Sequence, residues 1–188
     1  MVSLLYGQRF SVTFYARMGY SFEDNLFYQE VCMSPLPSMP RGMYFEEFEA
    51  GQHIITAGRT ITEADVVGFA GISGDYNQIH VDVEYSQKAP FGQRVAHGLL
   101  VLSVVSGLAV QTGVMEGTVL AFREINEWKF SKPVYFGDTI HAELDVRETK
   151  PLARLGGGSV LIEIAVKNQK NETVMKGMWT VLIASKSS

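Results

Sequence analysis

The sequence predicts an α+β domain in which an antiparallel β-sheet wraps around one long α-helix. Two patterns predict this architecture: a strongly apolar segment from residue 95 to about residue 115, and strand-like runs that follow it at hairpin spacing. The chain has 188 residues, of which 46% are hydrophobic and 19% charged, so one domain can bury a substantial core. A sheet curled around a single buried helix is the simplest packing of these parts.

The part of the domain that precedes the long helix is expected to consist of short elements. Residues 48–60 predict a turn followed by a strand. Thr62 and Asp65 have the spacing of a capping box, so a short helix is expected from there through Ala70. The glycine-punctuated residues 71–86 are expected to form a loop, and the apolar helix is expected to start at residue 95.

Four strand-like runs follow the long helix. They span residues 119–130, 139–147, 160–166 and 173–184, with turns expected at 133–138, 156–158 and 168–171. The three glycines at 156–158 are not followed by a helix or by the Lys-Ser/Thr pair of a phosphate-binding loop. They therefore predict a chain reversal rather than a nucleotide site.

Residues 1–40 differ in character from the rest of the chain. They are rich in aromatic residues without helical or strand periodicity, and they end in a proline-rich stretch at residues 34–40. We expect an N-terminal extension that is disordered or otherwise outside the fold, with a packed N-terminal arm as the alternative. Residues 41–188 are expected to form the single domain.

Charge and cysteine content bear on partners and compartment. The net charge is −4 and the Lys and Arg residues are scattered, so no nucleic-acid partner is expected. The apolar segment that starts at residue 95 is shorter than a membrane span and is interrupted by polar residues and glycines, so no membrane insertion is expected. Cys32 is the only cysteine, which fits a reducing compartment, and residues 1–9 do not resemble a secretory signal. We expect a cytoplasmic location.

Asp75 and His80 are the strongest candidates for catalysis. They lie five positions apart, and a carboxylate with an imidazole can share the deprotonation and delivery of one water molecule. Asp75 alone also fits a turn aspartate, and His80 alone fits a partly buried histidine with its hydrogen bonds satisfied. Both lie between two predicted helices, with Asn77 between them to organise the loop. On the residues alone, a functional pair and a structural role both remain open.

Residues near the start of the long helix are further candidates. The first turn of a helix offers unpaired N–H groups and a positive dipole end, which suit a developing negative charge on oxygen. Gly98 has no side chain to block that approach, although it could also serve tight packing, with His97 capping the helix. Arg94 could meet ligand phosphates or remain solvated, and Ser106 could face a cleft or the core. No pair of residues has the spacing of a metal site, so no metal is expected.

The segment Phe69–His80, with Ser86 six positions beyond the histidine, closely resembles the hydratase motif of the MaoC-like (R)-specific enoyl-CoA hydratases. Ala96–Leu100 and the pair Ser106-Gly107 are similar to the following helix in that family. The resemblance covers roughly residues 44–184 and implies the hotdog fold, usually as a homodimer or a higher homo-oligomer. Its one departure is Gln78, where the family usually has a proline that would stiffen the loop.

The resemblance implies reversible hydration of trans-2-enoyl-CoA thioesters to (R)-3-hydroxyacyl-CoA. The substrate would be an acyl-CoA, and no cofactor would be needed beyond its coenzyme A. Asp75 and His80 would form the catalytic dyad, and Gly98 would donate its N–H to the thioester oxygen. The residues expected to bind the substrate are Asn77, His97, Ser106 and Arg94.

The favoured hypothesis is an enzyme of this type. Asp75 accepts a proton from a water held between it and His80, the oxygen attacks the β-carbon, and His80 delivers a proton to the α-carbon. A hotdog thioesterase is an alternative, but it would need a carboxylate on or near the long helix, which carries no acid before Glu116. A non-catalytic acyl-CoA-binding module is a second alternative, and the presence of Asp75, Asn77 and His80 together argues against it.

Overall fold

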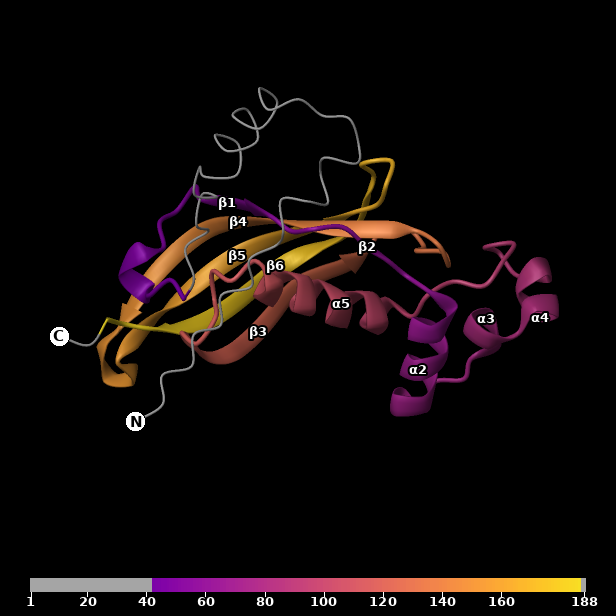
Figure 1. Cartoon of the computed structure of the whole chain (residues 1–188), viewed down its shortest axis with the longest axis horizontal. Coiled ribbons are helices and arrows are strands. Elements are labelled where there is room, and N and C mark those ends of the chain that lie inside the picture. The colour runs from indigo at the N-terminus through magenta and orange to yellow at the C-terminus, as the bar shows by residue number, and fades with distance from the viewer. Residues whose placement is uncertain (1–41, 187–188) are drawn as a thin grey trace, which may run out of the picture. The chain divides into compact units, whose positions relative to one another are not determined.

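A computed structural model describes residues 42–186, which form an α+β unit built on an antiparallel sheet (Figure 1). The strands follow the order β1 (His53–Ile55), β4 (Thr139–Leu152), β5 (Gly157–Lys167), β6 (Thr173–Ala184) and β3 (Val119–Phe130), and β2 (Arg59–Thr60) pairs separately with β4. Every one of these pairings is antiparallel. The expected N-terminal extension at residues 1–40 lies outside the described residues, so it stays a prediction.

The long helix α5 (Gly98–Gln111) runs along one face of the sheet (Figure 1). The side chains that it buries belong to the main apolar core: Leu100, Val101, Val104, Val105, Leu108 and Ala109. In β5 and in the first eight residues of β4, buried and half-buried residues alternate, as expected for strands that place every second side chain on a helix. The predicted sheet around one helix is confirmed. Among the described residues, no helix is long and apolar enough to span a membrane.

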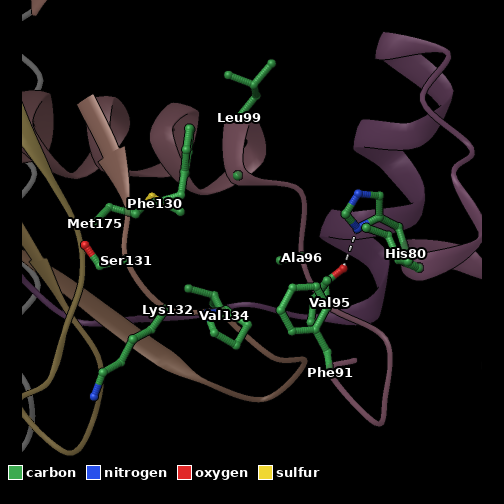
Figure 2. Close-up of a pocket in the computed structure, with 13 residues that line it drawn as sticks. His80, Phe91, Val95, Ala96, Leu99, Phe130, Ser131, Lys132, Val134 and Met175 are labelled. Carbon is green, nitrogen blue, oxygen red and sulfur yellow. Dashed lines mark hydrogen bonds between the residues drawn. The ribbon is translucent and has the colours of Figure 1, made fainter. Parts of the chain in front are cut away.

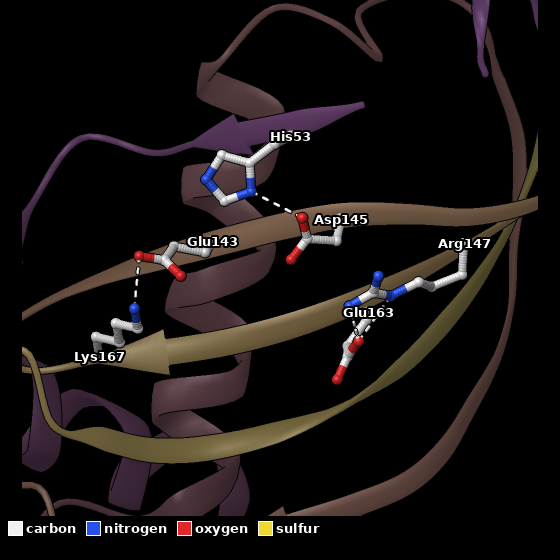
Figure 3. Close-up of polar contacts among 6 residues, drawn as sticks. All are labelled: His53, Glu143, Asp145, Arg147, Glu163 and Lys167. Carbon is white, nitrogen blue, oxygen red and sulfur yellow. Dashed lines mark hydrogen bonds and ion pairs between the residues drawn. The ribbon is translucent and has the colours of Figure 1, made fainter. Parts of the chain in front are cut away.

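The other face of the sheet carries charged pairs (Figure 3). Asp145 on β4 lies directly opposite Glu163 on β5. Two negative charges at facing positions repel each other, which destabilises the strand pair. His53 contacts Asp145 at 2.8 Å, and Arg147 forms an ion pair with Glu163, so each acid has its own basic partner. These partners explain why two facing acids are tolerated on the polar side of the sheet.

The strands agree closely with their predicted bounds where turn residues delimit them. β3 and β6 coincide with the predicted runs, whereas β4 and β5 are longer than predicted. The predicted reversal at residues 156–158 begins with η3 (Ala153–Leu155) and Gly156 at φ 61°, and the next two glycines already belong to β5. Gly158 is needed there because a Cβ would lie 2.2 Å from the ring of Phe45, which belongs to η2 (Phe45–Glu47).

The predictions for residues 48–73 are correct in type but not in length. The strand expected over residues 48–60 is two short strands, β1 and β2. The capping box is present: the Asp65 N–H donates to Thr62 Oγ1 at 3.2 Å, and the Thr62 N–H donates to the Asp65 carboxylate at 2.8 Å. The helix α2 (Glu63–Ser73) ends three residues later than expected, where Gly74 adopts φ 75°.

The loop expected over residues 71–86 is wrong, because this segment holds two short helices, α3 (Gln78–Val81) and α4 (Val83–Lys88). Asn77 caps α3 by accepting the Ile79 N–H at 3.3 Å, and Asp82 caps α4 by accepting the Tyr85 N–H at 2.9 Å. Residues that suggest a turn in sequence therefore serve here as helix N-caps.

The long helix starts three residues later than the predicted position, residue 95. Before it, the Val95 N–H donates to the Ile79 carbonyl at 3.1 Å and the Ala96 N–H donates to the Val134 carbonyl at 2.8 Å. Val95 also bridges to Tyr135. Because these extended residues bond to other segments, the helix begins only at Gly98. It ends at Gln111 rather than near residue 115, and Gly113 follows at φ 81°.

Candidate active site

A mainly apolar cavity of about 420 Å³ lies at the N-terminal end of α5 (Figure 2). His80 of α3 and Gly98 of α5 both line it. The opposite side is formed by the C-terminal end of β3 with Phe130 and by Met175 of β6, which is the register partner of Phe130. One polar side chain from a short helix and the start of a long helix therefore share an apolar cavity, which is typical of a small-molecule site.

His80 is held in one tautomer by its backbone partner. Its Nδ1 lies 2.7 Å from the Val95 carbonyl oxygen, and the side chain is only 8% exposed (Figure 2). A carbonyl oxygen can only accept, so Nδ1 carries the proton and Nε2 keeps its lone pair. Burial lowers the pKa of His80 from its ordinary value of 6.5, and nearby His97 lowers it further, against the opposing effects of the Val95 carbonyl and Asp75. His80 is thus neutral at physiological pH, and its Nε2 can accept a proton.

Asp75 lies in the turn between α2 and α3, and its geometry is fixed by its neighbours. Its N–H donates to Ser73 Oγ at 3.1 Å, and its Oδ1 accepts the Asn77 N–H at 3.2 Å. Asn77 thus orders the Asp75 carboxylate through its backbone and starts the helix that carries His80 through its side chain. A carboxylate oxygen of Asp75 and one ring nitrogen each of His80 and His97 lie within 4.8 Å of one another.

These three groups could in principle hold a metal ion, but their orientation is unsuitable. The His80 and His97 rings are stacked, with centroids 3.8 Å apart and an interplanar angle of 28°. Nitrogen lone pairs lie in the ring plane, so those of two nearly parallel rings do not converge on one ion as tetrahedral coordination requires. One nitrogen of each ring is also within hydrogen-bond distance of a backbone carbonyl. The arrangement suits proton transfer to and from a small molecule better than metal binding.

Gly98 is the first residue of α5, so its N–H has no intrahelical acceptor. The ring of Phe130 packs against it: a Cβ on Gly98 would lie 2.6 Å from Phe130 Cε1. Figure 2 shows Phe130 beside the first turn of α5, near Leu99. Glycine at this position therefore allows both the close approach of Phe130 and access to the positive end of the helix.

The structure brings together some of the predicted site residues and separates others. Asp75, His80 and His97 form one cluster, Asn77 supports it, and Gly98 shares the cavity with His80. Arg94 does not line the cavity, because its guanidinium pairs with Glu63 at 2.7 Å and lies 4.6 Å from the centre of the Phe136 ring. Ser106 lies two turns further along α5, half-buried and also outside the cavity wall.

Three site residues were not predicted from the sequence. Val95 fixes the His80 tautomer through its carbonyl, and Phe69 packs on His97 with ring centroids 5.1 Å apart. Phe130 forms part of the cavity wall from the end of a distant strand. Every residue has a backbone carbonyl, so the residue type of Val95 gives no sign of this contact. Aromatic residues near a core usually serve only packing. No pattern in the sequence could have singled them out.

The model of the MaoC like domain matches residues 47–168 of this chain. The (R)-specific enoyl-CoA hydratase of Rhodospirillum rubrum is 31% identical over 143 residues, which are 76% of this chain and 93% of that protein. Protein MaoC of Klebsiella aerogenes is 41% identical over 105 residues, which are 56% of this chain but only 31% of the longer relative.

Solved structures agree with this relationship. An R-hydratase from Pseudomonas aeruginosa, solved without ligand, has a TM-score of 0.66 and 29% identity, covering 77% of this chain and 88% of that one. A Mycobacterium tuberculosis protein with a double hotdog fold has a TM-score of 0.68 at 17% identity, covering 78% of this chain and 46% of that one. The predicted hotdog fold is confirmed. Because the family model spans well over half of its residues, the chain belongs to the MaoC-like domain family.

Proposed function

We propose that this chain catalyses the reversible hydration of trans-2-enoyl-CoA thioesters to (R)-3-hydroxyacyl-CoA. The reaction class, a hydro-lyase reaction, follows from the family and from the names of its relatives. The observation that carries the specific proposal is the approach of the exposed Asp75 carboxylate to the neutral His80, which lines an apolar cavity together with Gly98 at the start of α5. General acid–base chemistry on one water needs no cofactor beyond the coenzyme A of the substrate.

The mechanism uses Asp75 and His80 on a single water molecule. Two acceptors up to about 5 Å apart can each accept one O–H of the same water, because each hydrogen bond spans about 2.8 Å. The water oxygen bonds to the β-carbon while the dyad takes up the proton that the water loses. A proton returns from the dyad to the α-carbon, so the sum is addition of H and OH. His80 starts neutral, so the proton that Asp75 takes from the water must reach Nε2 of His80 before His80 can deliver it to the α-carbon.

Negative charge moves to the thioester oxygen as the new C–O bond forms. The Gly98 N–H at the start of α5 is the donor proposed to stabilise that oxygen, and an apolar surrounding strengthens the interaction. In this proposal Arg94 and Ser106 do not contact the acyl group. Arg94 is paired with Glu63, and neither residue lines the cavity.

The helix composition speaks against the thioesterase alternative. α5 from Gly98 to Gln111 contains no carboxylate, and the acid of the cluster with His80 and His97 is Asp75, which lies in the turn between α2 and α3. Asp75 could, however, activate water for attack on a thioester carbonyl as well as for addition to a double bond. The assay must therefore distinguish the products.

Crotonyl-CoA supplies that assay. We expect the absorbance of the enoyl thioester to fall when protein is added, with no thiol released to a thiol reagent. Thiol release at the same rate would instead indicate a thioesterase, and no change in either signal with measurable crotonyl-CoA binding would indicate a binding module. The stereochemistry of the product, read by chiral separation, tests the (R) assignment.

We propose that the functional unit is a homodimer or a higher homo-oligomer. β3 forms one edge of the described sheet, and several large apolar side chains on it are exposed: Leu120 (49%), Phe122 (45%), Ile125 (41%) and Phe130 (54%). An exposed apolar edge strand is normally covered in a native protein. A second copy along this edge would cover these side chains, among them Phe130 of the cavity wall.

Substituting Gly98 tests the proposed oxyanion contact. Gly98→Ala adds a Cβ that meets the Phe130 ring at 2.6 Å, so this ring, which is part of the cavity wall, must shift. Alanine keeps the N–H, but the added methyl and the displaced ring move the thioester oxygen away from it, so we expect turnover to fall by about 10²-fold, while urea unfolding changes by about 1 kcal/mol or less. Gly107→Ala in the same helix is the matched control, because an added Cβ there meets no described atom within 4 Å. Equal turnover in the two variants would show that the reaction does not need an unblocked approach to the start of α5 at Gly98.

A further inference from the structure

His97 is buried beside the proposed dyad but does not line the cavity. It is 2% exposed and is the N-cap residue of α5, although its side chain makes no capping hydrogen bond. One face of its ring stacks on His80 at 3.8 Å, and Phe69 packs on it at 5.1 Å. Asp75 is also absent from the cavity wall, but it is exposed, whereas His97 is buried between two rings and is therefore not placed to touch the acyl group.

The polar contact of His97 points to Asp75 rather than to a ligand. Its Nε2 lies 2.9 Å from the Asp75 backbone carbonyl, and since a carbonyl only accepts, Nε2 carries the proton. Its Nδ1 is buried and has no hydrogen-bond partner among the described residues. A buried nitrogen without a partner is unfavourable, so retaining an imidazole here needs a reason beyond packing.

We propose that His97 is a positioning residue that fixes the Asp75 turn and the His80 ring relative to each other, and that it does not bind substrate. This inference rests on the function proposed above. One imidazole ties the Asp75 backbone to the start of α5 and covers one face of the His80 ring. The His80 ring is also fixed in its plane by the Val95 carbonyl, and the Asp75 carboxylate by the Asn77 N–H. Asp75 and His80 are thereby both held in place relative to the start of α5.

A positioning role predicts different effects on kcat and on KM. Displacing a reacting group by about 1 Å can cost about 10²-fold in rate, even when the change lies outside the substrate contacts. A residue that only positions the dyad should therefore affect kcat and leave KM unchanged. A residue that binds the acyl-CoA, or that merely fills the core, should not give that pattern.

Two substitutions separate the two contacts of His97. His97→Phe keeps a ring on His80 but has no donor for the Asp75 carbonyl, whereas a glutamine has an amide N–H at nearly the position of Nε2. We expect His97→Phe to lower kcat for crotonyl-CoA hydration by about 10²-fold with KM within about twofold of wild type. His97→Gln should recover about tenfold or more of that loss. Val105→Ala, a buried core change in the same helix, is the control for destabilisation alone and should keep kcat.

A double-mutant cycle with Asp75→Asn makes the test decisive. If His97 acts through Asp75, adding His97→Phe to Asp75→Asn should lower kcat by less than about twofold more, because the two residues act as one unit. Three results overturn the proposal: wild-type kcat in a folded His97→Phe variant, a loss confined to KM, or losses that multiply in the double variant. Wild-type turnover in Asp75→Asn alone would instead show that the dyad itself is wrong, a result distinct from these three.

Discussion

Asp75→Asn is expected to lower the turnover of crotonyl-CoA by about 10²–10⁴-fold without unfolding the protein. The amide keeps the size of the carboxylate and an oxygen that can still accept the Asn77 N–H, which lies 3.2 Å from Oδ1 in the structure. It cannot take up a proton from water at neutral pH. Asp75 is exposed, so the substitution removes no buried interaction, and thermal unfolding should be nearly unchanged.

Asp82→Asn is the matched control for that result. Asp82 caps α4 by accepting the Tyr85 N–H at 2.9 Å, seven positions along the chain from Asp75. Asparagine caps a helix about as well as aspartate does, so this variant should keep turnover within about twofold of wild type. Turnover measured on both purified variants, with their circular dichroism, decides the matter: equal rates in the two would leave Asp75 a turn residue and nothing more.

The parts of the fold that could be predicted are those that local chemistry determines. The Thr62–Asp65 capping box predicted the start of α2, and strand-like runs next to turn residues predicted β3 and β6 with the observed bounds. The start of α5 could not be predicted, because the Val95 and Ala96 N–H groups bond to carbonyls of distant residues. Likewise, Asn77 and Asp82 are turn formers and helix caps alike, and only the folded geometry decides between the two.

The candidate site divides in the same way. Asp75 and His80 are only five positions apart, so it could be predicted from one segment of sequence that they lie close together in space. The cavity wall could not, because Phe130 and Met175 come from two strands that meet only when the sheet forms. Nor could the surroundings of His97 be predicted: its residue type and position suggested a substrate contact, whereas it is buried and its Nε2 contacts the Asp75 backbone carbonyl.

Gln78 is a departure from the family pattern that the structure makes understandable. It is the first residue of α3, a position that proline favours because its missing N–H needs no intrahelical partner there. A glutamine at this position loses the fixed φ of proline but breaks no hydrogen bond. Its carbonyl accepts the hydroxyl of Ser86 at 3.1 Å and the Asp82 N–H at 2.9 Å, which hold α3 against α4. The side chain is exposed and lies outside the cavity wall, so its effect on acyl-group choice is expected to be small.

His80→Asn should remove the nitrogen that receives and delivers the proton while keeping the contact that holds this side chain in place. The asparagine amide lies near the position of Nδ1 and can still donate to the Val95 carbonyl, but it offers no nitrogen lone pair in place of Nε2. We expect a loss of turnover of about 10²–10⁴-fold. His80→Ala should lose as much turnover and also be less stable than His80→Asn by about 1–3 kcal/mol in urea unfolding, because it leaves the buried carbonyl without a donor.

The acid limb of the wild-type enzyme provides an independent check on the same residue. Burial lowers the pKa of His80 below 6.5, so the neutral, active form should persist in the folded protein to pH values below 6.5. The midpoint of the acid limb of kcat/KM is therefore expected below 6.5. A midpoint above that value would mean that a group other than His80 must lose its proton for catalysis.

Stability should follow the same titration with a definite sign. As pH falls from 6.5 toward the lowered pKa of His80, the unfolded chain takes up a proton before the folded protein does. The wild type should therefore lose stability across this window, and the loss should stop below the folded-state pKa. His80→Asn has no such group, so its free energy of unfolding should vary less with pH over the same range. An identical pH dependence of unfolding in the two proteins would show that His80 does not titrate as a buried, neutral base.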